Sequence, residues 1–408
     1  MPFGGNGINF IGIISQSGDN MKKITKFDKF IFLFAFLLFL ICFSIAFKQS
    51  LMSGTDLFIH NHEALDLSNI IQFKLTYPLY HLMVLVVYKF GKLFFPFLMS
   101  LEGASAIVMG LIEVTVYLLT NRVLNQYGVK KSEFVSFMLC IVTAIWLPFY
   151  NVNIYLGQGS PNTWHSPTNM VVKPFAMLIF FMVVNLLEKI KTDEEISLKE
   201  YILLSFLLIL SDLAKPSFYQ GFIPALFLYI IFALIYSRFQ YVKQYFILGL
   251  SIVPATILIL FQMFSNFFTG VGNSDGGIGI GWFLVPKLYS PNIIISLVLL
   301  MGFPICFTFL KRESLKRLDL KLAWIYFIIS YLEYGLLYEK GERFAHGNFG
   351  WAYSLAALIL FIVTTGLFFA RFKKEKTQDK ILLGVWLLHG ISGMLYICIL
   401  LFIPNIWF

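Results

Sequence analysis

Three polar side chains, Asp56, His60 and Glu63, follow the first long apolar segment at intervals of four and three residues. If this segment is helical, the three side chains share one face. A carboxylate partly shielded from water can act as a general base, and neighbouring imidazoles can bind a polar substrate. We therefore expect Asp56 to be catalytic, and His60, His62 and Glu63 to bind substrate. The alternative is a solvated polar face or a helix cap.

The same segment holds residue types that bind metals elsewhere. Its order, His60-Asn61-His62-Glu63, differs from the HExxH spacing of helical zinc sites. The sequence therefore predicts no cofactor; a divalent metal is possible, but no motif supports it.

A second polar segment, GQGSPNTWHSPT at residues 157–168, is dense in turn formers and in amide, hydroxyl and indole groups. Sugars present hydroxyls, which amides can bind, and apolar faces, on which a Trp ring can pack. We expect Gln158, Trp164 and His165 to bind substrate. The alternative is a folded cap over the helices.

Two lysines next to prolines, Lys173 and Lys215, lie at the ends of apolar segments. A charged group at membrane depth costs about 2.5–3.5 kcal/mol on insertion scales, so it usually pairs or serves a site. We expect both lysines to bind an anionic substrate group. Lys173 can instead extend toward the membrane surface, and Lys215 can instead pair with Asp212.

The third polar cluster is EKGERFAHGNFGW at residues 339–351. Arg343 suits bidentate phosphate recognition and can join the two lysines in a cationic pocket. Glu342 and His346 are further substrate-binding candidates. The alternative for Arg343 is a salt bridge to Glu339 or Glu342.

The composition requires a lipid environment for this chain. Of 408 residues, 58% are hydrophobic and 13% charged, and the mean hydropathy is +0.78. A soluble domain averages about 25% charged residues, so a soluble enzyme is excluded, and the 46 Phe and 20 Tyr exclude intrinsic disorder. The four cysteines lie within apolar runs and suggest neither disulfides nor a zinc site.

We expect an all-α polytopic membrane bundle, because a span needs about 20 apolar residues. Residues 1–29 are expected to form a cytoplasmic N-terminal extension, and residues 30–408 a single transmembrane catalytic domain. About eleven spans are expected: 30–47, 103–121, 134–151, 170–187, 201–214, 218–236, 245–266, 291–310, 322–338, 351–370 and 381–403.

The apolar stretch YPLYHLMVLVVYKF at residues 77–90 is short and can either span or lie in the membrane interface. If it is interfacial, 22 of the 31 Lys and Arg residues fall on one side. The positive-inside rule then makes that side cytoplasmic. His81, near the start of this interfacial helix, is a weaker substrate-binding candidate, because a structural role is at least as natural.

With this topology the long polar loops lie outside, at residues 48–102, 152–169, 267–290 and 339–350. Long ordered loops usually carry function. We therefore expect an extracytoplasmic active site on a multi-pass protein of the cell membrane.

This layout resembles the GT-C class of membrane glycosyltransferases. The resemblance lies in a first span, an early acidic residue (Thr55-Asp56), and a Pro-aromatic interfacial helix ending in Phe90-Gly91 before the second span. The GQGSPNTWHSPT and KPF segments are similar to bacterial relatives that decorate polysaccharides. In these relatives a second acidic residue often follows the first, whereas here Leu57 stands there.

The resemblance implies a hexosyltransferase that needs no nucleotide. Its donor would be a sugar on polyprenyl (undecaprenyl) phosphate, and its acceptor a surface glycan or glycolipid. Asp56 would take the acceptor proton in an inverting reaction, and Lys215 and Arg343 would stabilise the leaving lipid phosphate. No nucleic-acid partner is expected.

Two other functions remain open from the sequence. A lipid-linked polysaccharide polymerase would use the same donor class, but with its longest outer loops later in the chain. A lipid or polysaccharide flippase would show charged residues along a path through the membrane and paired broken helices.

Overall fold

The computed structural model describes residues 28–66, 77–151, 157–268 and 277–403, and most of the chain within these ranges is helical. The expected extension, residues 1–29, lies almost wholly outside the described residues. The elements, in chain order, are α2 (Lys29–Ser50), α3 (Asp56–Leu65), α5 (Leu79–Phe94), α6 (Leu101–Gln126), α7 (Ser132–Ile141), α8 (Pro167–Thr192), α9 (Leu198–Ala214), α10 (Ser217–Tyr236), α11 (Val242–Phe268), β1 (Ile278–Ile280), α12 (Leu284–Tyr289), α13 (Ile293–Leu310), the 3-10 helix η3 (Arg312–Lys316), α14 (Leu318–Leu336), β2 (Leu337–Glu339), the 3-10 helix η4 (Gly341–His346), α15 (Gly350–Phe369) and α16 (Thr377–Phe402).

The expected polytopic helical architecture is confirmed at this level. Eight of the described helices are long and apolar enough to cross a membrane: α2, α6, α8, α10, α11, α13, α15 and α16. The other three expected spans fall on α7, α9 and α14, which have 10, 17 and 19 residues. The count of eleven spans therefore stays a prediction.

The outward faces of several helices carry large apolar side chains. On α11, Phe246, Ile257 and Leu260 are 66%, 63% and 58% exposed. Contiguous exposed apolar surface of this kind is unfavourable in water. Because it lies on helices of membrane-spanning length, it indicates that the protein is embedded in a membrane.

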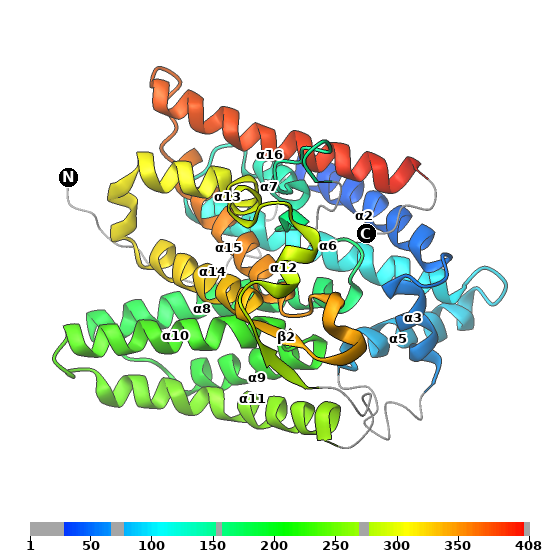
Figure 1. Ribbon diagram of the computed structural model, residues 1–408, viewed down its shortest axis with the longest axis horizontal. Coiled ribbons are helices and arrows are strands. Elements are labelled where there is room, and N and C mark those ends of the chain that lie inside the picture. Colours follow the sequence, from blue (N-terminus) through cyan, green and yellow to red (C-terminus); the bar gives the residue numbers. More distant parts are fainter. Residues whose placement is uncertain (1–27, 67–76, 152–156, 269–276, 404–408) are drawn as a thin grey trace.

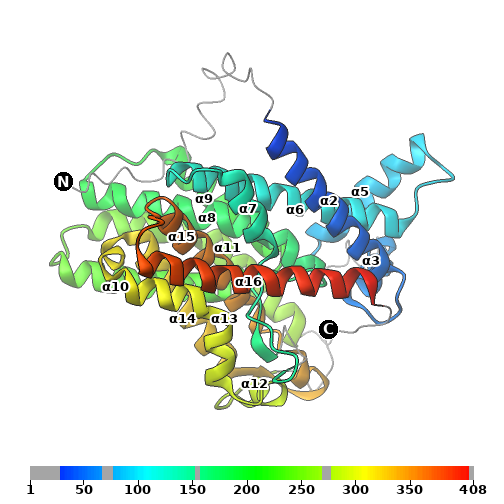
Figure 2. The same cartoon turned by 90° about the horizontal axis from the view of Figure 1, so that it is seen from above.

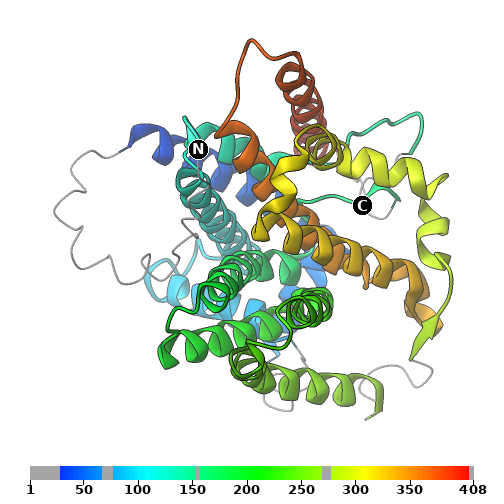
Figure 3. The ribbon, with the colours of Figure 1, turned by 90° about the vertical axis from the view of Figure 1, so that its left-hand side faces the viewer.

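Helix α15 forms the centre of the bundle. All its residues from Ala352 to Phe368 are buried, and it contacts α6, α8, α10, α13 and α14. Figure 3 looks along the bundle and shows these helices arranged around it. A helix that is apolar on every side belongs in such a core.

The expected span at 134–151 is helical only as far as Ile141. Beyond that point the backbone bonds to other elements: Ile145 N donates to Leu299 O at 2.9 Å, and Trp146 N donates to Ser392 Oγ at 3.0 Å. Gly393 of α16 lies so close to Ile141 O that a Cβ there would sit 1.7 Å from it. The chain thus leaves its helix to pack against α13 and α16.

The two ends of the bundle are built differently, as Figures 1 and 2 show. At the site end, where α2 finishes, lie α3, α5, β1, β2 and η4. The connector end holds the turns between α8 and α9, α10 and α11, α13 and α14, and α15 and α16. At the site end β1 pairs antiparallel with β2, with Ile278 opposite Glu339, and thereby joins the expected outer segments 267–290 and 339–350.

Candidate functional site

Helix α3 begins at Asp56, contains His60 and Glu63, and is firmly anchored. Thr55 caps it: its Oγ1 accepts from Phe58 N at 3.2 Å and donates to Gln49 O at 2.7 Å. On the inward face, Asn61 bonds Ser50 Oγ at 3.0 Å and accepts from Tyr80 OH at 2.8 Å. These contacts fix α3 against α2 and α5 and leave the Asp56 side chain exposed in the first turn.

Asp56 acts electrostatically on two expected site residues from distant parts of the chain. Its carboxylate favours the charged forms of both Lys215, at the α9–α10 junction, and His165, before α8. Burial opposes this and prevails, so the pKa of Lys215 is lowered to about 8 and that of His165 to about 4. At pH 7, therefore, Lys215 is a cation and His165 a neutral imidazole.

The indole of Trp351, in the first turn of α15, completes this arrangement. Lys215 Nζ lies 4.6 Å from its ring centroid, and the His165 ring centroid lies 5.5 Å away. Trp351 Nε1 donates to Asn348 Oδ1 at 3.3 Å, which holds the ring. The sequence prediction did not select Trp351, although it closes the third polar cluster. We call Asp56, His165, Lys215 and Trp351 the anionic-ligand site.

A second group of expected residues converges one turn further along α3. The side chains of His60 and Glu63 contact each other, Nδ1 to Oε2, at 3.0 Å. His81 of α5 brings its Nε2 to 3.3 Å from the same carboxylate oxygen and to 3.1 Å from His60 Nδ1. We call these three side chains the His-Glu-His cluster.

Burial and hydrogen bonding shift the pKa values of two side chains in this cluster, Glu63 and His81. The hydrogen bonds from His60 and His81 outweigh burial and lower the pKa of Glu63 to about 2. Burial lowers the pKa of His81, against the attraction of Glu63. His62 points elsewhere, since its exposed ring bonds Phe58 O at 2.8 Å.

The second polar segment lies in the interior rather than over the surface. Gln158 is 3% exposed and Trp164 1% exposed. Asn162 donates to Leu139 O at 2.8 Å and Val142 O at 2.9 Å, so its amide satisfies carbonyls left free where α7 ends. This segment therefore stabilises the break after α7 and also places His165 where the charge of Asp56 acts on it.

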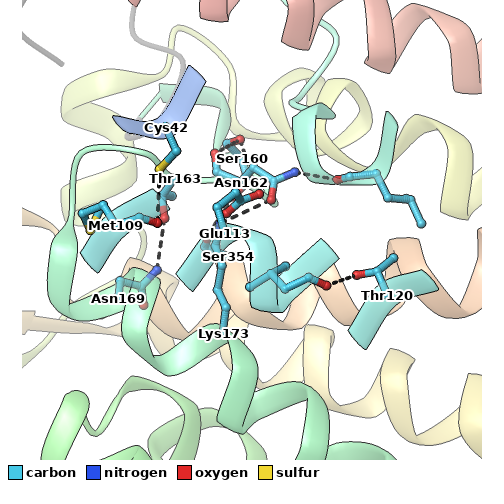
Figure 4. Close-up of polar contacts among 12 residues, drawn as sticks. Cys42, Met109, Glu113, Thr120, Ser160, Asn162, Thr163, Asn169, Lys173 and Ser354 are labelled. Carbon is cyan, nitrogen blue, oxygen red and sulfur yellow. Dashed lines mark hydrogen bonds and ion pairs between the residues drawn. The ribbon is translucent and has the colours of Figure 1, made fainter. Parts of the chain in front are cut away.

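Lys173 lies among these interior groups, as Figure 4 shows. It is 1% exposed, its Nζ donates to Asn162 Oδ1 at 3.3 Å, and Glu113 Oε2 is 3.9 Å away. Its observed partner is thus a carboxylate of α6, within the helices.

Arg343, Glu342 and His346 lie on the exposed 3-10 helix η4. No contact described here joins Arg343 to Lys215. The neighbouring Glu339 of β2 does favour the charged form of Lys215. The third polar cluster is therefore linked to the anionic-ligand site through Glu339 and Trp351.

The alternative partner for Lys215 is not observed. Among the residues that the structure describes, Asp212 and Lys215 form no ion pair, and the carboxylate of Asp212 has no hydrogen-bond partner. The main-chain oxygen of Asp212 accepts from Gln262 Nε2 at 3.0 Å. Lys215 instead faces Trp351.

Comparisons with protein-family models, with curated proteins and with solved structures find no match to this chain. Function is therefore inferred from the chemistry of the anionic-ligand site and of the His-Glu-His cluster.

Proposed function

We propose that the protein is a GT-C-type hexosyltransferase that moves a sugar from polyprenyl (undecaprenyl) phosphate to a surface glycan or glycolipid. The observation that carries the proposal is the anionic-ligand site. An exposed carboxylate on a capped helix acts electrostatically on a half-buried lysine that rests on an indole. A base and a cation that interact in this way match the two charges that such a transfer creates.

In the proposed reaction the acceptor hydroxyl attacks the anomeric carbon and inverts it. Its proton passes to the Asp56 carboxylate, while the bond from the anomeric carbon to the phosphate oxygen breaks. The electron pair of that bond leaves with the lipid phosphate, whose negative charge Lys215 stabilises. A cation in a site of low dielectric stabilises such charge more than a cation in water does.

The arrangement around the reacting groups suits a glycosyl donor. Trp351 offers an apolar ring face on which a sugar can pack, and the neutral His165 can exchange hydrogen bonds with its hydroxyls. Arg343, on the exposed helix η4 of the third polar cluster, would bind a second oxygen of the lipid phosphate. Helices α3 and α5 lie between α2 and α6 in the sequence. This position is consistent with that of the interfacial helices of the GT-C class.

The proposal includes the membrane topology expected from the charge distribution. The site end faces the extracytoplasmic side of a bacterial plasma membrane, and the N-terminus is cytoplasmic. Exposed apolar helices beside the site end would let a polyprenyl chain approach through the lipid.

The test uses membranes containing the full chain and a panel of undecaprenyl-phosphate-linked hexoses. The expected result is release of undecaprenyl phosphate with transfer of one hexose to a surface glycan. Cells lacking the protein would lose that decoration. Failure to consume any donor, together with unchanged surface glycans, would contradict the proposal. Products that grow by many sugars would instead identify a polymerase.

A flippase is the second candidate, favoured by one observation. Glu113 and Lys173 are 0% and 1% exposed inside the helices, as expected of charged groups along a transport path. Their substitution to Gln and Met would then stop lipid movement in vesicles. Substitution of Asp56 would leave that movement intact. A flippase therefore requires Glu113 and Lys173, whereas the transferase requires Asp56.

A further inference from the structure

The His-Glu-His cluster has the composition of a transition-metal site. Two imidazoles and one carboxylate form the ligand set of several catalytic zinc sites, which leave a fourth position open. Magnesium and calcium prefer oxygen ligands. The donor set of His60, Glu63 and His81 therefore favours zinc or a similar first-row divalent ion.

The distances between the donor atoms fit a single ion. His60 Nδ1, Glu63 Oε2 and His81 Nε2 are separated by 3.0, 3.1 and 3.3 Å. With bonds of about 2.0–2.2 Å, ligands of a zinc ion lie about 3.3 Å apart at tetrahedral angles and about 3.0 Å apart at right angles. The triangle is thus already close to the size that one metal ion requires.

The orientation of His81 presents a lone pair to this point. Its Nδ1 faces the main-chain oxygen of Tyr77 at 3.2 Å and must donate to it, since a carbonyl can only accept. In the neutral ring Nε2 then carries no proton. A backbone carbonyl that fixes the tautomer of a histidine is the usual outer partner of a metal-ligating imidazole.

A metal ion can also replace the proton that these three side chains share. An ionised carboxylate and the unprotonated Nε2 of His81 face His60 Nδ1, so acceptors surround one small space. One proton on His60 can serve two of them, whereas a metal ion serves all three. Access from solvent exists, because the side chains of His60 and Glu63 are 25% and 37% exposed while His81 is 1% exposed.

We propose that His60, Glu63 and His81 bind one divalent transition-metal ion, with zinc as the expected occupant, and that the ion joins α3 to α5. The ion would lie one helical turn from Asp56 and would hold that carboxylate in place relative to α5. The proposal does not rest on the proposed function, because metal binding is measured without any substrate.

The experiment uses the full chain, purified in detergent, stripped with a chelator and then given Zn²⁺ alone. Elemental analysis after removal of free metal should find one zinc per chain. Glu63→Gln and His81→Ala should each weaken binding at least tenfold. His62→Ala is the matched control, because it removes an exposed imidazole from the same helix and should leave binding unchanged. Excess Mg²⁺ should not displace the zinc.

Replacement of zinc by Co²⁺ gives a second readout that does not depend on the variants. The wild-type chain should show the visible absorption of a four- or five-coordinate site, and imidazole ligation should be seen by X-ray absorption. Variants are compared only where their gel-filtration profile matches that of the wild type. The proposal is overturned if the wild type retains no metal, or if Glu63→Gln retains as much as His62→Ala.

Discussion

Asp56 and Lys215 at the site end have different surroundings from the basic side chains at the connector end. At the connector end basic side chains lie directly against carboxylates, at distances of 2.5–2.7 Å. These pairs are Lys189–Glu200, Lys311–Asp379 and Arg317–Asp319. At the site end Lys215 rests on an indole ring, and its nearest described carboxylates act on it only at longer range.

The comparison separates charges that build the structure from charges kept available for a ligand. At the connector end, Asp319 also accepts from Tyr127 OH at 2.7 Å, and Asp379 accepts from Lys373 N at 2.8 Å. Such carboxylates have little remaining capacity to bind anything else. Lys215 instead contacts an indole, and the Asp56 side chain is exposed.

A large effect is expected from removing the cation at the site end. Lys215→Met should lower the turnover of hexose transfer by about 10²- to 10³-fold, because one stabilising group for the leaving phosphate is lost. Lys243→Met makes the same change at an exposed position of the connector end and should leave turnover unchanged. Equal losses in both variants would remove the distinction between the ends.

Lys311→Met, at the connector end, is expected to lower stability and to leave turnover almost unchanged. This change leaves the Asp379 carboxylate, whose side chain is 2% exposed, without its cation. The protein should lose about 1–3 kcal/mol of stability, measured as a lower apparent melting temperature in detergent. Turnover per folded molecule should stay within twofold of the wild type. A strong loss of turnover at full stability would contradict a purely structural role for this end.

The pH profile tests the state of Lys215. Because its pKa is about 8, the cation is present below that pH and is lost above it. Transfer by the wild type should therefore fall about fivefold from pH 8 to pH 9, and about tenfold for each further pH unit. Lys215→Arg retains its charge and should move this alkaline limb upward by more than one unit. An unmoved limb would assign it to another group.

The smallest effect is expected at the indole. Trp351→Leu removes a cation–π contact worth about 0.5–2 kcal/mol, so transfer should fall about 2- to 30-fold, mainly through weaker donor binding. Trp282→Leu removes an indole that is 66% exposed at the same end and serves as the control. If transfer falls equally in the two variants, Trp351 makes no specific contribution to donor binding.

Local sequence patterns predicted many of the helices, because apolar length and side-chain spacing within a segment largely determine helix formation and orientation. The spacing of Asp56, His60 and Glu63 predicted a shared face if their segment is helical, and the segment is helical from Asp56 onward. Apolar length predicted the long helices, and eight of these meet the requirements of a membrane span. His60 and Glu63 lie on one helical face, as three-residue spacing requires.

The parts that the sequence did not reveal depend on contacts between distant segments. His81 lies 21 residues after His60, and no periodicity in the sequence predicts that the two side chains are in contact. The sequence therefore did not predict His81 as the third member of the cluster. Lys173 faces inward toward Glu113 because of the rotation of α8 within the bundle. The early end of α7 depends on bonds to α13 and α16, which no local pattern encodes.

The most direct test of the central claim compares Asp56→Asn with Asp193→Asn in the same membrane preparation. Asp193 is exposed at the connector end with φ of 57°, a conformation that Asn adopts readily. Asp56→Asn should lower hexose transfer from undecaprenyl phosphate by about 10²- to 10⁴-fold, as expected for loss of a general base, while Asp193→Asn should match the wild type. Transfer at the wild-type rate by Asp56→Asn would contradict the account.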